Sequence, residues 1–289
     1  LKTTNPGQVF LARGNHEELS IQSRYGFLEE GRAKYGETFN ARKIMRAYDF
    51  LPVVIYPGSG ENFIQCNHGG MEPGYSPREL LAAVGPIRFQ LLGDLNQRKF
   101  CGTHPDWITD SSSRDLAERA LRDFKPQDPI SPSVIGFMWN DFSILVTEPQ
   151  LGYDPGRAFV YGQRTTQLLL QSASTGDRKL QAVFRGHQQS PVLNPIMRRL
   201  IASRGVFRHW QEKDSATLLN ASPDDLSKRL ETGEERPVPS GSVWTFNVSP
   251  DSMYGEGCNY TFDAFGLLKV VPQFTDWRLR IVNVPVATK

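Results

Sequence analysis

The chain has 289 residues, of which 39% are hydrophobic and 22% charged, a composition typical of a folded globular protein and not of a disordered one. Its formal net charge of +2 is too balanced to indicate binding to nucleic acid or to an acidic membrane surface. No apolar run approaches the roughly 20 residues that a membrane-spanning helix needs, and three scattered cysteines without a CxxC pair favour a reducing compartment over a disulfide framework.

Apolar periodicity predicts alternating helices and strands. Runs with strand character occur at residues 9–12, 53–56, 62–66, 181–184, 242–246, 267–272 and 277–284. Helical spacing of apolar residues predicts helices at residues 17–35, 41–50, 111–123 and 165–172. A short turn containing glycine separates the runs at 53–56 and 62–66, which indicates a hairpin, and turn-forming residues predict a loop at 152–156.

Residues 197–241 differ from the rest of the chain because charged and polar side chains dominate there. We expect a single domain that covers residues 1–289, with an insertion at about 197–241. The first residue is Leu1 and not Met, and no signal-peptide pattern of basic, apolar and small segments follows it. We therefore expect the chain to begin within a domain and to belong to the cytoplasm or the nucleus.

Three histidine motifs follow apolar runs at widely separated places. They are Gly14-Asn15-His16-Glu17, His68-Gly69-Gly70 and Gly186-His187-Gln188. Strands that end in glycine and then present metal-binding side chains can meet at one edge of a sheet. An amide oxygen such as that of Asn15 suits a hard divalent cation, while the adjacent His16 leaves the backbone in another direction and can face a substrate. The repetition of this layout predicts metal-dependent phosphate chemistry.

Taken singly, each motif has a simpler structural alternative. Asn15 can cap a helix while His16 packs, His68 can be a surface residue in a turn, and His187 can bond to a carbonyl. His104 and His209 lack the preceding strand and glycine, so we expect both at the surface. Cys66 lies in an apolar run, which favours the role of a small buried hydrophobe.

In this order, the motifs resemble those of the phosphoprotein phosphatase family, the serine/threonine phosphatase branch of the calcineurin-like metallophosphoesterases. The resemblance rests on Arg13-Gly14-Asn15-His16-Glu17, Asn67-His68-Gly69-Gly70, Arg185-Gly186-His187-Gln188, Ser23-Arg24-Tyr25-Gly26-Phe27, Phe50-Leu51-Pro52, Trp139-Asn140-Asp141 and Phe159-Val160-Tyr161-Gly162. It covers most of the chain, from about Gln8 to Lys269. It implies an α/β (α+β) fold in which a β-sandwich is flanked by helices, here N-terminally incomplete.

The resemblance also implies a hydrolase of phosphoric monoesters that acts on phosphoserine and phosphothreonine with two metal ions, from among Mn²⁺, Fe and Zn²⁺. Asn15, His68 and His187 would bind one metal, and a bridging carboxylate would join it to the other. A metal-bound hydroxide would attack phosphorus, and His16 would protonate the departing alkoxide as general acid. The partners implied are a phosphoprotein substrate and a regulatory protein, without nucleic acid or membrane.

The resemblance also implies an arginine that clamps the phosphate group. An arginine would hold phosphate oxygens with its planar fork, and Arg157 is the candidate. It lies nearer to Gly162 than the arginine of the family would, so a solvent-exposed arginine remains the alternative.

The sequence departs from the family because it lacks two earlier motifs, Gly-Asp-x-His-Gly and Gly-Asp-x-x-Asp-Arg-Gly. These supply the ligands of the other metal, the bridging aspartate, the aspartate that orients the acid histidine and one phosphate arginine. Gly93-Asp94 lacks the residues that would follow in either motif and is better read as a turn. Two further hypotheses therefore stay open: a metallophosphohydrolase of the same fold that acts on nucleotides, and a catalytically silent regulatory chain derived from a phosphatase.

Overall fold

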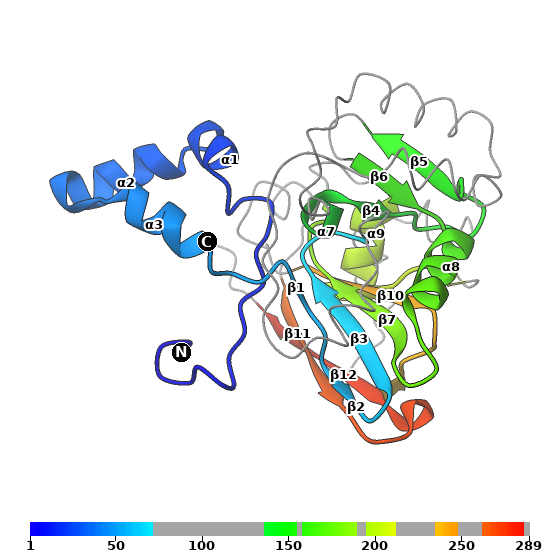
Figure 1. The fold of residues 1–289 in the computed structure, drawn as a ribbon. Helices are drawn as coiled ribbons and strands as arrows, with labels where there is room; N and C mark the ends of the chain where they lie inside the picture. The colour runs from blue at the N-terminus through cyan, green and yellow to red at the C-terminus, as the bar shows by residue number, and fades with distance from the viewer. Residues whose placement is uncertain (72–135, 155–157, 190–194, 212–234, 248–261, 286–289) are drawn as a thin grey trace, which may run out of the picture.

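The computed structural model describes residues 1–71, 136–154, 158–189, 195–211, 235–247 and 262–285 (Figure 1). The helices there are α1 (Leu19–Arg24), α2 (Phe27–Tyr35), η1 (Gly36–Thr38), α3 (Ala41–Tyr48), α7 (Gly136–Trp139), α8 (Gln163–Ala173), α9 (Pro195–Ala202) and η3 (Phe274–Asp276). The strands there are β1 (Val54–Ile55), β2 (Gly58–Ser59), β3 (Asn62–Asn67), β4 (Asp141–Phe142), β5 (Leu151–Asp154), β6 (Ala158–Tyr161), β7 (Lys179–Arg185), β8 (Val206–Arg208), β9 (Glu235–Pro237), β10 (Ser242–Phe246), β11 (Phe262–Lys269) and β12 (Arg278–Pro285).

The strands of the described residues form three sheets. Sheet A has six strands in the order β1-β3-β7-β10-β8, with β2 also paired to β3. Its central strands β3, β7 and β10 run parallel, whereas β1, β2 and β8 are antiparallel to their neighbours. Sheet B has the order β4-β6-β5, and sheet C the order β11-β12-β9. The α/β class expected from the sequence is therefore confirmed.

Sheets A and C pack face to face. Successive side chains of a strand point to opposite faces, so each face of sheet A contributes to a different apolar cluster. In β7, Ala182 belongs to the apolar cluster shared with sheet C, and its neighbour Val183 belongs to the cluster on the other face. Trp244 and Val243 of β10 divide in the same way. Helix α8 and sheet B supply side chains to that second cluster, so sheet A is the central layer (Figure 1).

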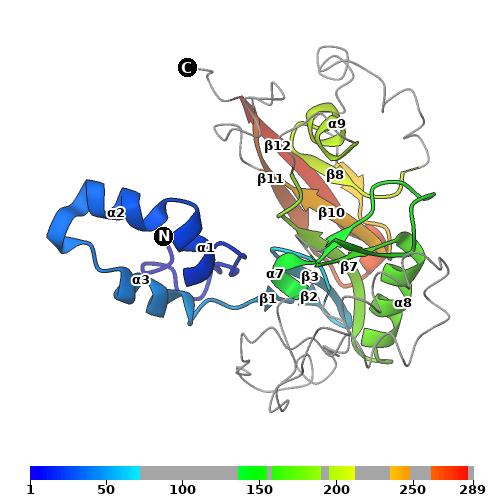
Figure 2. The same cartoon turned by 90° about the horizontal axis from the view of Figure 1, so that it is seen from above.

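Helices α1, α2 and α3 form a unit that stands apart from the sheets in both views (Figures 1 and 2). The helix predicted at 17–35 is divided at Gly26, where a φ of 80° separates α1 from α2. Glycine adopts this left-handed backbone without steric cost. The strand predicted at 9–12 is wrong: these residues form no strand, and Phe10 and Leu11 are 59% and 50% exposed.

Most of the other described predictions are confirmed with shifted ends, including the hairpin of β1 and β3. The loop predicted at 152–156 is wrong in its first half, because Leu151–Asp154 pair with β6 as strand β5. Within the expected insertion at 197–241, α9 contributes to an apolar cluster and β8 belongs to sheet A, while residues 212–234 lie outside the described part. The helix predicted at 111–123, His104 and Gly93-Asp94 also lie outside it.

The packing of Cys66 agrees with the role expected from its apolar run. Cys66 packs, partly buried, against the cluster between sheets A and C, and burial raises the pKa of its thiol to about 12. Such a thiol stays protonated and inert, as expected for a small hydrophobe.

None of the helices in the described residues has the length and apolar character needed to cross a membrane.

His209 is buried, which corrects the expectation that it lies at the surface. It follows β8 and is only 2% exposed. Its Nδ1 donates to the carbonyl of Ser143 at 2.8 Å, and its Nε2 accepts from the Thr245 hydroxyl at 2.8 Å. These partners select the neutral tautomer with its proton on Nδ1. Burial lowers the pKa of His209 to about 3, so the ring stays neutral across the physiological range.

This burial predicts an acid-sensitive part of the stability. The pKa of His209 is about 3 in the folded chain and 6.5 as an ordinary histidine, so the unfolded chain takes up the proton first as the pH falls. The stabilisation is complete above about pH 6.5 and is lost toward about pH 3, by at most roughly 4–5 kcal/mol. Urea unfolding at a series of pH values should show a steeper loss for the wild type than for His209→Gln. Parallel curves would contradict a buried neutral His209.

Candidate functional site

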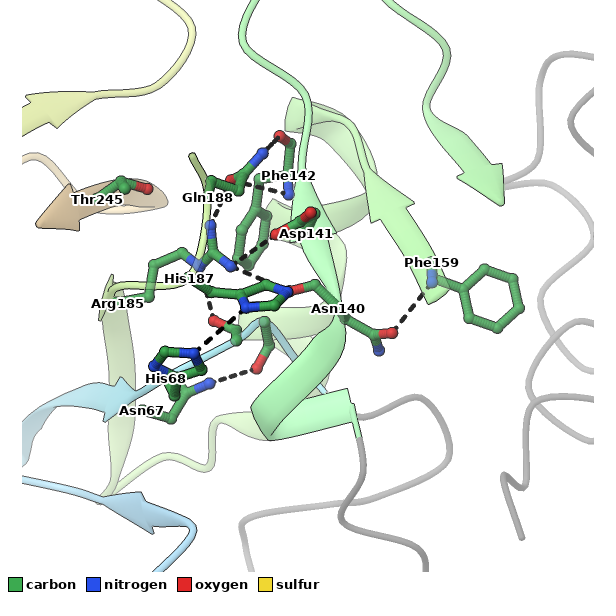
Figure 3. Close-up of polar contacts among 12 residues, drawn as sticks. Asn67, His68, Asn140, Asp141, Phe142, Phe159, Arg185, His187, Gln188 and Thr245 are labelled. Carbon is green, nitrogen blue, oxygen red and sulfur yellow. Dashed lines mark hydrogen bonds and ion pairs between the residues drawn. The ribbon is translucent and has the colours of Figure 1, made fainter. Parts of the chain in front are cut away.

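His68 and His187 meet at the carboxyl ends of two adjacent parallel strands. β3 and β7 pair in a register that places Asn67 opposite Arg185, so both segments leave the sheet at the same edge. The Gly186 N–H donates to the His68 carbonyl at 3.1 Å, and Nδ1 of His187 lies 3.3 Å from Nε2 of His68 (Figure 3). The structure thus brings these two predicted residues together.

The backbone of His187 is held in an uncommon conformation. Its φ is 68°, in the left-handed region that a side chain with a Cβ rarely adopts. Such a residue costs about 1–3 kcal/mol and persists only where its surroundings fix it. Gln188 does so: its N–H donates to the Gly186 carbonyl at 2.8 Å, and its Nε2 donates to the Phe142 carbonyl at 2.8 Å. This backbone turns the His187 ring back toward His68.

The N-terminal motif approaches the same edge. A Cβ added to Gly14 would lie 3.1 Å from the His68 ring, so the segment passes directly over that imidazole. Asn15 is 4% exposed, and its Oδ1 is buried without a hydrogen-bond partner among the described residues. A buried carbonyl oxygen of this kind costs about 1–3 kcal/mol unless a donor or a cation satisfies it.

Two side chains shape the turn that carries Asn15 and His16. The Glu17 carboxylate accepts from the Gly14 N–H at 2.6 Å, and Nε2 of Gln22 donates to the His16 carbonyl. His16 itself is exposed, with its ring centroid 5.3 Å from that of Tyr25. The turn therefore buries Asn15 and presents His16 to solvent, as adjacent residues with separate roles would require.

The protonation state of His68 suits ligation. Burial lowers its pKa to about 3, with further lowering by the nearby His187, Arg185 and His16, while Asp141 acts in the opposite sense. A neutral imidazole has a free lone pair, which is the form that binds a metal. His16 is close enough to His68 to affect this pKa electrostatically.

The spacing of the two histidines fits a single cation bound by both rings. Two nitrogens bound at about 2.0–2.1 Å to one tetrahedral cation lie about 3.3–3.4 Å apart, and the two ring nitrogens here lie 3.3 Å apart. Within the described residues, however, no group of three His, Cys, Asp or Glu side chains could hold a metal. The buried Oδ1 of Asn15, which follows Gly14 on the segment next to His68, is the candidate for a third donor.

Behind the histidines, a buried ion pair joins three segments. Nη2 of Arg185 lies 2.7 Å from Oδ1 of Asp141, with both side chains at most 3% exposed. Arg185 also donates through Nε to the Gly69 carbonyl at 2.7 Å, through Nη2 to the Asn140 carbonyl at 3.3 Å, and through Nη1 to the Gln188 side chain (Figure 3). One guanidinium thus ties β7 to the segments that follow β3 and α7.

Glycine allows the segment after His68 to touch α7. The Gly69 N–H donates to the Phe137 carbonyl at 2.6 Å, and a Cβ on Gly69 would lie 2.4 Å from the backbone of Met138. A Cβ on Gly70 would lie 2.8 Å from the Asn140 carbonyl. The double glycine is therefore explained by close backbone approach.

Asn140 is a second buried connection. Its Nδ2 donates to the Met71 carbonyl at 2.7 Å and to the Tyr161 hydroxyl at 3.1 Å, and its Oδ1 accepts from the Phe159 N–H at 3.1 Å. The amide thereby joins the segment after β3 to sheet B.

Sequence reasoning quoted Arg185, Asp141 and Asn140 as motif residues but missed their structural roles. The available signal was the presence of polar residues beside apolar runs, at Arg185 after Phe184 and at Asp141 before Phe142. Arg157, the candidate for the phosphate clamp, lies outside the described residues.

Comparison with curated proteins finds serine/threonine phosphatases. The chain is 40% identical over 74 residues to "Serine/threonine-protein phosphatase PP1-1" of Saccharomyces cerevisiae and to "Serine/threonine-protein phosphatase SIT4" of Candida albicans, and 37% identical over 73 residues to "Serine/threonine-protein phosphatase ppe1" of Schizosaccharomyces pombe. Each match covers 25% of this chain, which spans only 22–23% of the length of these relatives. No protein-family model matches the chain.

Over that quarter of its length, the chain is similar to serine/threonine protein phosphatases, which confirms at this level the resemblance inferred from the motifs. The fold agrees with that relation, since it is a mixed α/β architecture.

The contact between Gly69 and α7 predicts that Gly69→Ala destabilises the chain by about 1–3 kcal/mol, because the added Cβ overlaps backbone that cannot move independently. Gly176→Ala is the matched control, since a Cβ there meets nothing within 4 Å, and its effect should stay within about 0.5 kcal/mol. Urea unfolding measures both. Equal effects of the two substitutions would contradict the close packing of α7 on Gly69.

The buried ion pair predicts that Asp141→Asn lowers the free energy of unfolding by about 3–5 kcal/mol, because Arg185 keeps its charge in a buried site. Glu61→Gln removes one carboxylate from the exposed pair with Lys179, whose nitrogen and oxygen are 2.6 Å apart, and should cost less than about 1 kcal/mol. Guanidinium unfolding of the two variants compares them directly. A cost for Asp141→Asn as small as that for Glu61→Gln would show that the pair is not desolvated.

Proposed function

We propose that the intact protein is a serine/threonine protein phosphatase that hydrolyses phosphoserine and phosphothreonine with divalent metal ions. The observation that carries the proposal is the meeting of His68 and His187 at one sheet edge, with the Asn15 segment lying over His68. The relatives with that printed activity support it, although they are matched over a partial region.

The described residues have distinct roles in this proposal. His68, His187 and Asn15 would hold one cation from among Mn²⁺, Fe and Zn²⁺, and the intact family site would hold two. When bound, such a cation polarises a phosphate oxygen and lowers the pKa of coordinated water. His16 projects from the same turn as Asn15 and would donate its imidazole proton to the serine or threonine oxygen as the ester bond breaks.

Exposure of His16 is consistent with this role. A general acid must reach a bulky phosphoprotein substrate, and His16 is exposed while Asn15 beside it is buried. The His16 carbonyl accepts from Gln22 and the His16 ring lies near Tyr25, so these two contacts restrict the orientation of the acid.

The donor set also indicates that this chain alone binds metal weakly. All three donors are neutral, whereas divalent sites usually include anionic ligands that offset the charge of the cation. Among the described residues, Asp141 is the carboxylate that affects the pKa of His68, and this carboxylate is paired with Arg185. This observation favours a second candidate function for the chain on its own, a catalytically silent regulatory protein.

The test measures Mn²⁺ binding by calorimetry, together with hydrolysis of an aryl phosphate, a phosphoserine peptide and a dinucleotide. Asn15→Ala and His187→Ala should abolish Mn²⁺ binding because each removes a donor, whereas Asn5→Ala, in the N-terminal turn, should not. His16→Ala should keep Mn²⁺ binding and lower phosphoserine hydrolysis by about 10²–10⁴-fold. It should affect the aryl ester less, because that leaving group needs little protonation.

The outcomes separate the hypotheses. Mn²⁺ binding that depends on Asn15 and His187 without hydrolysis of any substrate would support the silent regulatory chain. Faster hydrolysis of the dinucleotide than of the phosphoserine peptide would support the nucleotide-directed enzyme. Mn²⁺ binding that is unchanged in both donor variants would refute the metal site.

A further inference from the structure

A groove lies between α2 and α3, and none of the residues of the histidine edge lines it. It has a volume of about 580 Å³, and residues of α2, η1 and α3 line it. This volume falls in the range of about 300–1,000 Å³ that is typical of ligand sites. Because the unit of α1, α2 and α3 stands apart from the sheets, the groove is not covered by sheet A or sheet C (Figures 1 and 2).

The floor of the groove is built by one close contact. Gly31 is buried, and a Cβ added to it would lie 2.2 Å from the Phe39 ring, so the ring packs flush on the α2 backbone. Phe27 meets Phe39 in an edge-to-face contact, with ring centroids 6.1 Å apart. Ile44 and Tyr35 complete the apolar lining, and Tyr35 is 62% exposed. The groove therefore offers a preformed apolar surface.

The rim of the groove is basic. Three charged residues line it, Glu30, Lys34 and Lys43, which together carry a net charge of +1. On the rim, Lys34 is paired with Glu30. Lys43 is exposed and has no ion-pair partner among the described residues. An apolar floor with a cationic rim is complementary to a partner with apolar anchors and flanking carboxylates.

We propose that this groove docks an amphipathic helix of another protein, with large apolar side chains on one face and Asp or Glu beside them. A groove between two helices is a common receptor for such a helix, whose anchors recur at i, i+3 or i+4, and i+7. The apolar anchors would contact Phe39 and Ile44, and a carboxylate would pair with Lys43. The proposal is independent of catalysis, because none of these residues belongs to the histidine edge.

The test uses the full chain and a fluorescein-labelled helical peptide about four turns long, with Leu and Phe anchors and flanking Glu. Fluorescence anisotropy should show binding. Lys43→Glu should weaken it by about three- to tenfold, as expected for reversal of one charge on the rim. Arg42→Glu is the matched control: it makes the same charge change on the neighbouring exposed residue of α3, which does not line the groove, and should leave binding nearly unchanged.

A second variant tests the shape of the groove without changing its charge. Gly31→Ala places a Cβ 2.2 Å from the Phe39 ring and displaces that ring, so binding should weaken while circular dichroism stays as in the wild type. If Gly31→Ala reduces the helical signal, the proposal is tested by the comparison of Lys43→Glu with Arg42→Glu alone.

Several results would overturn the proposal. They are absence of binding, equal weakening by Lys43→Glu and Arg42→Glu, and equal binding of a peptide whose Leu and Phe anchors are replaced by Ala. Concentration-dependent dimerisation of the free chain that Lys43→Glu abolishes would identify a second copy of this chain as the occupant, in place of an acidic partner.

Discussion

The buried contact between Arg185 and Asp141 is the constraint on which the site depends. Two charges in a site that excludes water interact strongly, but only while both are present and hydrogen-bonded. Arg185 meets this requirement with four different acceptors, which belong to Asp141, Gly69, Asn140 and Gln188. Two of them flank the histidines in sequence, since Gly69 follows His68 and Gln188 follows His187. The geometry of the two rings is therefore set by the guanidinium behind them.

Much of the architecture could be predicted because it depends on local periodicity. β3, β7 and β10 appear in the sequence as short apolar runs, and their parallel pairing brings their carboxyl ends to one edge. The meeting of His68 and His187 follows from that rule alone. The burial of His209 could not be predicted in this way, because its partner Ser143 comes from the segment after β4 and its partner Thr245 comes from β10.

The failures at the N-terminus have a different physical reason. An apolar run such as 9–12 indicates that side chains favour burial, but a strand also needs a neighbour for its backbone hydrogen bonds. Among the described residues the run finds none, and Phe10 and Leu11 remain exposed. The division of the helix at 17–35 was visible in principle, because Gly26 is the residue that tolerates a left-handed backbone. The helical spacing of apolar residues continues on both sides of Gly26, so this spacing alone predicted one helix instead of two.

The ion pair also governs the electrostatics of the proposed cation site. Arg185 and Asp141 act on the pKa of His68 with opposite signs, so the carboxylate offsets part of the effect of the guanidinium at the imidazole. Without that carboxylate, the full positive charge of Arg185 behind three neutral donors would repel a cation, and the repulsion would be large in a poorly solvated site. Asp141 therefore acts on the site through Arg185, because it reduces the repulsion that the guanidinium would otherwise exert on a cation. The buried Oδ1 of Asn15 adds a further attraction for a cation at this edge, because it is a carbonyl dipole without a donor among the described residues.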